Sequence, residues 1–162
     1  MQSCDQQRLE RFCSPHAGAF ANIGDVVVLD IPGQQPGQPM TVLEVYRTTG
    51  EILCVWHARG GTPNRATFHA AELRVIQRAP KSVDGALNFD PQIASVFQHP
   101  SLAAQLRSGG VTMCALVQIN FDHEREITQD DLLDLTVRCN WHDDDGQLWV
   151  EHYPLITLMA AA

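Results

Sequence analysis

Two cysteine–histidine pairs of equal spacing are the residues whose types could bind a metal ion. Cys13 stands three residues before His16, and Cys139 stands three residues before His142. Zinc needs about four thiolate or imidazole ligands that converge on it tetrahedrally. Residues 136–142 alternate like a strand, and strand residues three apart point to opposite faces, so Cys139 and His142 should diverge. We therefore predict a buried cysteine beside a surface histidine, and neither a metal site nor a cofactor.

A run of three carboxylates, Asp143–Asp145, could in principle bind calcium. It lacks the alternating ligands and the distal glutamate of an EF-hand loop. Gly146 follows it directly, and Asp-Gly is typical of the tight turn of a β-hairpin because the glycine tolerates positive φ angles. We expect the run to be the solvated tip of a hairpin.

Catalytic signals are weak. The chain contains no nucleophile elbow, no phosphate-binding glycine loop and no helical zinc-protease motif. Cys54 and Cys114 lie in apolar strand-like segments, where a thiol packs as a small hydrophobe. Asp122, His123 and Glu124 could supply an acid and a base, but they also read as the polar end of a strand. We predict that the protein is not an enzyme, with a small hydrolase or a metal-binding protein as an alternative.

The first half combines aromatic and basic side chains that could bind nucleic acid. Tyr46, His57, Arg59 and Arg65 could stack on bases and contact phosphates. However, residues 1–81 contain seven acidic and eight basic residues, and so weak a positive balance attracts phosphates poorly. A nucleic-acid-associated regulator that acts through these residues is therefore the alternative hypothesis.

Carboxylates dominate the second half, where residues 82–162 contain twelve acidic and three basic residues. Such a surface attracts a positively charged partner and speeds its association. Plain solubility would account for the same charge. The candidate partner-binding residues are Asp122, Glu124, Asp130, Asp131, Asp134, Asp143, Asp144 and Asp145.

The elements that position these residues read as short strands from Gly24 onward. Strands are expected over residues 26–29, 40–47, 52–58, 65–69 and 73–76, separated by turns rich in glycine and proline. Alternation places Met40, Val42, Glu44 and Tyr46 on one face of the second strand. Five short strands joined by tight turns favour a small closed barrel. Its expected core is Val26, Val42, Val55, Trp56, Phe68 and Leu73.

The second half reads as a mixture of helices and strands, without an internal repeat that links it to the first half. Asp90-Pro91 favours a helix start, and a second helical piece runs through Leu106 to a stop at Gly109-Gly110. A strand over 111–121, a helical turn over 128–133 and a hairpin of residues 136–142 and 147–153 should follow.

Five motifs follow one another in the first half: Gly24-Asp25-Val26-Val27-x-Leu29, Pro39-Met40-Thr41-Val42, Cys54-Val55-Trp56, Thr67-Phe68 and Leu73. In this order they resemble the YodC-like family of small proteins, over residues 22–77. The resemblance implies an SH3-like barrel of a domain of unknown function, and it carries over no catalytic residue. Two places depart from the family: the loop before Met40 is longer, and His57 replaces a common aromatic residue.

The length, the apolar segments and the cysteine content limit the classes of protein to which the chain can belong. The 162-residue chain has no apolar run near the 18–20 residues, roughly, that cross a bilayer, and its first residues lack the apolar segment of a secretory signal. Five cysteines, an odd number at irregular spacing, favour a reducing cytoplasm. We expect a mainly β or α+β chain with an N-terminal extension (1–21), an SH3-like barrel (22–78), a linker (79–88) and an acidic α+β domain (89–162).

Together these observations predict a cytoplasmic, non-enzymatic interaction protein that docks on a basic, nucleic-acid-binding protein. Some accessory or inhibitory factors of phages and other mobile elements act in this way. A protein partner is favoured over nucleic acid and no membrane contact is expected, while the oligomeric state stays open.

Overall fold

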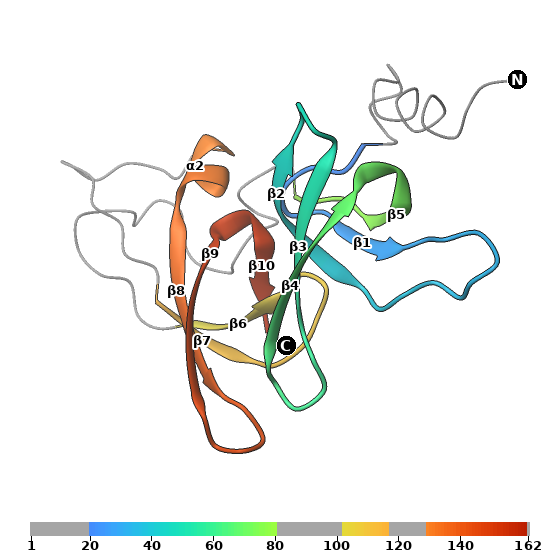
Figure 1. Cartoon of the computed structure of the whole chain (residues 1–162). Helices are drawn as coiled ribbons and strands as arrows, with labels where there is room; N and C mark the ends of the chain where they lie inside the picture. The colour runs from blue at the N-terminus through green and yellow to red at the C-terminus, as the bar shows by residue number, and fades with distance from the viewer. Residues whose placement is uncertain (1–19, 81–101, 117–128, 162) are drawn as a thin grey trace, which may run out of the picture.

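Two antiparallel sheets of five strands each make up most of the structure, a computed structural model that describes residues 20–80, 102–116 and 129–161 (Figure 1). The predicted mainly β character is confirmed. Within the described residues, none of the helices is long and apolar enough to cross a membrane.

The first sheet has the strand order β4-β3-β2-β1-β5. A short 3₁₀-helix, η2 (Ala70–Glu72), links its last two strands along the chain. Each strand coincides to within two residues with one of the predicted segments, because valine-rich and aromatic runs between glycine and proline turns leave little choice. The strands are β1 (Val26–Leu29), β2 (Met40–Tyr46), β3 (Glu51–His57), β4 (Pro63–His69) and β5 (Leu73–Gln77).

A bulge in β2 overturns the predicted alternation of that strand. The register with β3 shifts between Val42 and Glu44, so Leu43 is the extra residue. Val42 packs in the core of the first sheet, whereas Leu43 packs toward the second sheet. Beyond the bulge, Val45 returns to the face that Val42 occupies, which strict alternation had placed opposite. One bulge thus lets β2 present apolar side chains to both halves of the protein.

The second sheet has the strand order β10-β6-β7-β8-β9. The predicted hairpin and the predicted helical turn are both confirmed, the latter as a helix of six residues. The elements are β6 (Leu102–Leu106), β7 (Met113–Leu116), α2 (Gln129–Asp134), β8 (Thr136–His142), β9 (Leu148–Pro154), the 3₁₀-helix η5 (Leu155–Thr157) and β10 (Leu158–Ala160).

The predicted helical piece that ends at Gly109 is wrong over Leu102–Leu106, which form strand β6. Ala104 and Leu106 alternate into the core, and β6 pairs with both β7 and β10. Gly109 and Gly110 have φ angles of +91° and +124° and form the turn into β7 instead of a helix end. The other expected helix, which starts at Asp90, falls outside the described residues.

The two sheets are copies of one pattern, so the prediction of no internal repeat is wrong. In each sheet the fifth strand pairs with the first, and a 3₁₀-helix joins the fourth strand to the fifth. From Cys54 onward, residue n of the first sheet matches residue n + 85 of the second without a gap. Cys54-Val55-Trp56-His57 thereby matches Cys139-Asn140-Trp141-His142.

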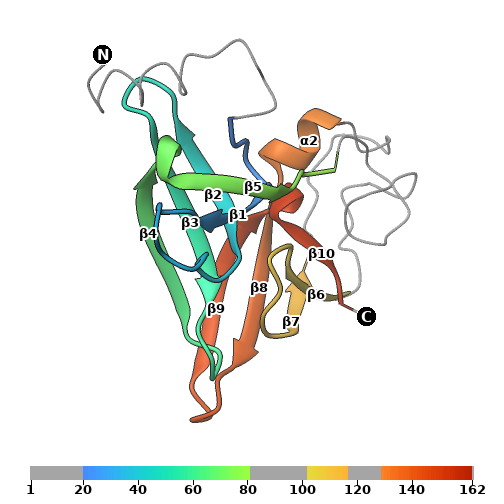
Figure 2. The same cartoon turned by 90° about the vertical axis from the view of Figure 1, so that its right-hand side faces the viewer.

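The core joins the two repeats asymmetrically. One apolar cluster lies inside the first sheet alone. The other fills the second sheet and includes Leu43 and Val55, which come from the outer side of the first sheet. Figure 2 shows β3 and β4 running beside β8 and β9. The outer side of one repeat therefore closes the interior of the other, and burial of apolar surface holds the two together.

The predicted core residues fall into two groups. Val26, Val42 and Val55 are buried, Val55 at the contact between the sheets. Trp56, Phe68 and Leu73 are only partly buried and pack around the first cluster.

Candidate binding site

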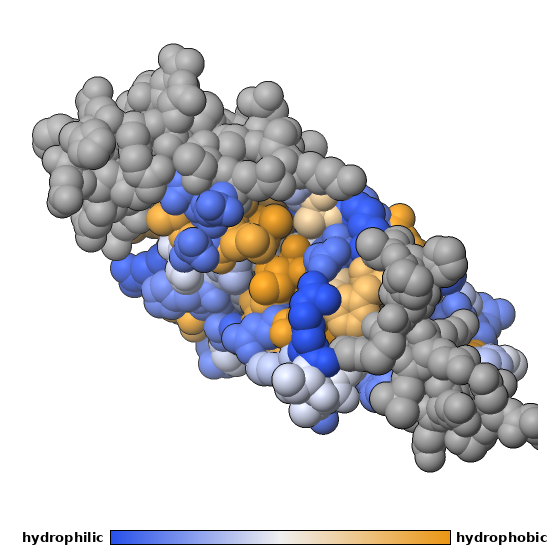
Figure 3. Space-filling model, turned by 90° about the horizontal axis from the view of Figure 1, so that it is seen from above, coloured by the Kyte–Doolittle hydropathy of each residue, from blue (hydrophilic) through white to orange (hydrophobic). Residues whose placement is uncertain are grey.

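A cavity of about 390 Å³ lies where the first sheet meets α2 and η5. Apolar side chains from both repeats line it: Ile23 and Val45 from the first repeat, Leu133 and Ile156 from the second. Seen from above, the end of the molecule that carries α2 exposes apolar side chains among polar ones (Figure 3). Sequence reasoning missed this cavity, because no local pattern relates Val45 to Leu133.

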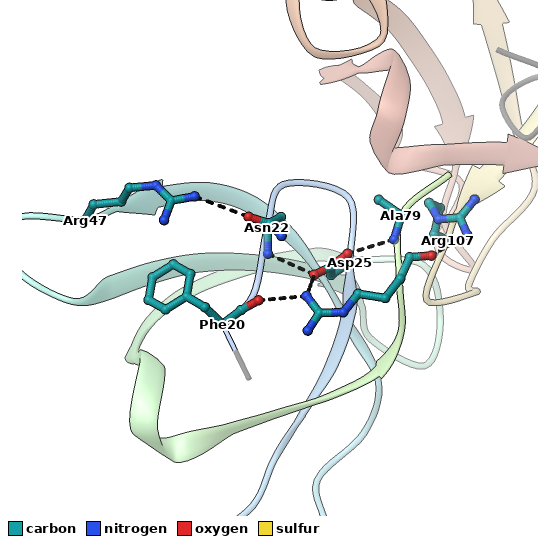
Figure 4. Close-up of polar contacts among 7 residues, drawn as sticks. Phe20, Asn22, Asp25, Arg47, Ala79 and Arg107 are labelled. Atoms are coloured by element: carbon teal, nitrogen blue, oxygen red, sulfur yellow. Dashed lines mark hydrogen bonds and ion pairs between the residues drawn. The ribbon is translucent and has the colours of Figure 1, made fainter. Parts of the chain in front are cut away.

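A buried carboxylate organises the floor of the cavity. Asp25 is 1% exposed and accepts hydrogen bonds from the backbone of Asn22 at 2.8 Å, the backbone of Ala79 at 2.7 Å and Nη1 of Arg78 at 2.8 Å (Figure 4). These bonds tie the start of β1 to the end of β5. A buried carboxylate with this many donors is well compensated.

Gly24 brings this floor against the second repeat. Its φ angle is +90°, and a Cβ there would lie 2.8 Å from the carbonyl oxygen of Ile156. Only glycine permits both the angle and the close approach. The Gly24-Asp25 step therefore has a structural role at the junction of the two repeats.

Two further guanidinium groups lie near this floor. Arg47 donates from Nη2 to Oδ1 of Asn22 at 3.2 Å, and its guanidinium lies 5.0 Å from the ring centre of Phe20. Arg107 donates to the carbonyl of Arg78 at 3.4 Å. Burial lowers the pKa of Arg107, and the nearby charge of Asp25 opposes that shift. Arg47 is exposed and lines the rim of the cavity.

Carboxylates of α2 flank the opposite rim. Leu133 lines the cavity with a side chain that is 47% exposed. Asp130 precedes it by three residues, which places both on one face of the helix, and Asp134 follows it directly. Asp130 and Asp134 are exposed, and neither forms an ion pair within the described residues, whereas Asp131 is buried.

The other predicted acidic residues lie elsewhere. Asp143, Asp144 and Asp145 form the hairpin tip at the far end of β8, a strand of seven residues that spans about 23 Å at 3.3 Å per residue. The fold therefore does not gather the predicted acidic residues on one face. Asp122 and Glu124 lie outside the described residues.

The side chain of Asp143 forms hydrogen bonds within the hairpin turn. Its carboxylate accepts hydrogen bonds at 2.9 Å from Nε1 of Trp149 and from the backbones of Gln147 and Asp145. These hydrogen bonds lower the pKa of Asp143, and the bond from Trp149 has the largest effect. Asp144 and Asp145 are exposed.

The four residues of the alternative nucleic-acid site do not form one surface. Tyr46 is exposed and hydrogen-bonds Glu44 at one end of the β2–β3 hairpin, whereas Arg59 is exposed beyond the other end of β3. Arg65 pairs with Glu151 of the second repeat at 3.0 Å. His57 is buried between the sheets.

His57 belongs to a contact that sequence reasoning missed. Its ring lies 4.7 Å from that of Trp141, centre to centre, and Nε1 of Trp141 donates to the carbonyl of Gly61 at 2.7 Å. Neither ring nitrogen of His57 has a hydrogen-bond partner among the described residues, and burial lowers its pKa to about 4. The duplicated Cys-x-Trp-His motif was the signal that could have revealed this contact.

The cysteines follow the strand geometry. Cys54 and Cys139 are buried, and burial raises the pKa of each to about 12. Cys139 and the exposed His142 diverge as predicted. Cys114, by contrast, is exposed on the outer side of β7 and not packed as expected. Cys13 and His16 lie outside the described residues.

Comparison with known proteins gives no assignment: no family model matches the chain, and neither does any curated protein or solved structure. The cavity and the repeated architecture therefore carry the functional argument.

Proposed function

We propose that this protein is a non-enzymatic interaction protein, and that the cavity beside α2 binds a segment of another protein with an apolar anchor and basic neighbours. The cavity carries the proposal. Its volume of about 390 Å³ is in the range, about 300–1,000 Å³, of pockets that bury most of a ligand. That room suits one or two apolar side chains of a partner.

The charges on either rim support the chemistry of this partner. Asp130 and Asp134 present exposed carboxylates beside Leu133, where they would attract lysine or arginine residues next to the anchor. Arg47, on the opposite rim, can donate to carbonyl groups of the bound segment. A basic partner also suits the net charge of −8.

The repeated fold is also compatible with a binding role. The strand order and the 3₁₀-helix before the last strand favour the SH3-like barrel that the YodC-like resemblance implies, and they favour it for both repeats. A cytoplasmic accessory or inhibitory factor of a phage or mobile element, which docks on a nucleic-acid-binding protein, fits such a module. The scattered positions of Tyr46, His57, Arg59 and Arg65 give no support to direct nucleic-acid binding.

Fluorescent peptides with one leucine between lysine or arginine residues test the proposal by anisotropy. We expect saturable binding that weakens with salt, that fails when the peptide leucine becomes serine, and that fails when its basic residues become glutamate. In the protein, Leu133→Ser should weaken binding by about tenfold or more, since a desolvated apolar anchor contributes about 1.5–3 kcal/mol.

Matched variants separate the two parts of the site. Asp130→Asn with Asp134→Asn should reduce the dependence of binding on salt, because exposed charges act mainly through screened attraction. Ile76→Ser removes a similarly exposed apolar side chain of β5 that does not line the cavity, and it should leave binding unchanged. Equal effects of Leu133→Ser and Ile76→Ser, or binding that the peptide leucine does not influence, would refute the proposal.

A further inference from the structure

The contact between the two repeats joins two different surfaces. We call the surface that receives a tryptophan side chain the acceptor side, and the surface that supplies this side chain the donor side. The acceptor side is the outer face of the first sheet, where the ring of His57 packs at a tilt of 45° against Trp141. The carbonyl of Gly61, on the same side, accepts the indole N–H of Trp141. The donor side is the second repeat, which inserts Trp141 and leaves it only 4% exposed. Next to the contact of His57 with Trp141, the backbone N–H of Asp144 donates to the carbonyl of Gly60 at 2.8 Å, so the two hairpin tips are also in contact.

The second sheet carries the same acceptor side, uncovered. By the shift of 85 residues, His142 and Gly146 match His57 and Gly61. Strand pairing places Leu148 opposite His142 and Val150 opposite Asn140, on this outer face. Leu148 is 54% exposed, whereas its match, Pro63, is partly buried. Val150 is 40% exposed, and its match, Arg65, is exposed as well. Cys114 belongs to this face too: its match, Thr41, is fully buried against Ser108, whereas Cys114 is exposed.

The first repeat carries the matching donor side. Trp56 corresponds to Trp141, yet it is only partly buried, and no hydrogen bond of its indole occurs among the described residues. Phe68, which matches the buried Tyr153, is also only partly buried. Within the chain, the acceptor side of the first repeat thus contacts the donor side of the second repeat. The acceptor side of the second repeat and the donor side of the first repeat remain open.

The open sides have complementary charge at the point where the hairpin tips would meet. The tip of the first repeat carries Arg59, which is exposed. The tip of the second repeat carries Asp144 and Asp145, which are exposed and form no ion pair within the described part of the chain. Repetition of the internal contact between two molecules would bring Arg59 against these carboxylates, because Arg59 matches Asp144 and Asp145 matches Gly60.

We propose that the protein self-associates head to tail, and that the first repeat of one molecule docks on the outer face of β7, β8 and β9 of the next. His142 would then cover Trp56 of the neighbour as His57 covers Trp141. Such an interface joins two different surfaces, so it propagates into a ring or a filament. Asn140 in place of Val55 makes this contact more polar than the internal one. The surface is separate from the cavity beside α2.

Two variants test the proposal because each breaks a different side. Arg59→Glu reverses the charge on the donor side, and Leu148→Glu places a charge in the acceptor side. Sedimentation velocity should show concentration-dependent assembly of the parent protein and monomers of each variant alone. An equimolar mixture of the two variants should form a discrete dimer, since each variant keeps the side that the other lacks. Ile76→Glu, on β5, is the matched control and should assemble like the parent.

The thiol of Cys114 reports on the same face without a change in the interface. In a chain with Cys4→Ser and Cys13→Ser, modification of Cys114 by a maleimide should slow severalfold as the protein concentration rises, and Leu148→Glu should abolish this slowing. A parent that stays monomeric at millimolar concentration would overturn the proposal. So would variants that assemble normally, or a mixture of the two variants that stays monomeric.

Discussion

The two repeats share one strand order, but they use the same surface differently. The outer face of β2 and β3 is buried against the second repeat, whereas the outer face of β7 and β8 is open. Conversely, Trp141 of the second repeat is buried while Trp56 of the first is only partly so. The strand order alone therefore does not determine the role of a sheet face, because the neighbouring elements determine which positions are buried.

The pair of tryptophans gives the largest test of this comparison. We expect Trp141→Ala to lower the free energy of unfolding by about 3–5 kcal/mol, because it empties a buried site and leaves the ring of His57 without its neighbour. Trp56→Ala should cost distinctly less, since its ring is partly exposed already. Urea unfolding of both variants checks this, and equal losses would show that the repeats do not differ at this position.

The carboxylate of Asp25 is not repeated in the second repeat, because the register places Leu102 at the matching position. Asp25→Ala should lower the free energy of unfolding by about 3 kcal/mol, because it leaves three donors without their acceptor and the guanidinium of Arg78 unbalanced. Asp30→Ala is the control, since it breaks an exposed pair with Arg74. Thermal unfolding of both variants gives the comparison, and a loss no larger than that of the control would contradict it.

His57 should make stability depend on pH. Burial lowers its pKa from 6.5 to about 4, so the unfolded chain binds the proton more tightly than the folded protein does. Neutral His57 therefore leaves the free energy of unfolding at its full value above pH 6.5. As the pH falls, protonation of the unfolded chain lowers this free energy, by about 2 kcal/mol at pH 5.

Urea unfolding between pH 7 and pH 5 measures this dependence. His57→Phe should remove it, whereas His142→Phe, at the matching exposed position, should retain it. A pH profile that His57→Phe leaves unchanged would contradict the role of His57.

The ion pair between Arg65 and Glu151 should have the smallest effect. It links the two sheets at 3.0 Å, but both side chains are partly exposed. A double-mutant cycle with Arg65→Met and Glu151→Gln should give a coupling of about 0.5 kcal/mol that salt weakens. A coupling several times larger would mean that this pair, and not apolar packing, joins the repeats.

Local patterns determined most of the strands. Valine-rich and aromatic runs between turns predicted β1 to β5, because such runs depend on residues close in sequence. An Asp-Gly turn and a capped polar run predicted the β8–β9 hairpin and the helix at Gln129–Asp134 for the same reason. The divergence of Cys139 and His142 followed from strand geometry alone. Charge counts placed the acidic residues in the second half, but they carried no information on which would lie together.

The tertiary structure decided the rest. Leu102–Leu106 can form either helix or strand by local propensity, and pairing with β7 and β10 selects the strand. The first two strands of the repeats are related by shifts other than 85 residues, and only the duplicated Cys-x-Trp-His motif marked the repeat in the sequence. The burial of His57, the cavity beside α2 and the separation of the acidic residues along β8 all depend on which faces meet. Contacts between residues far apart in sequence determine that choice, and no local period encodes it.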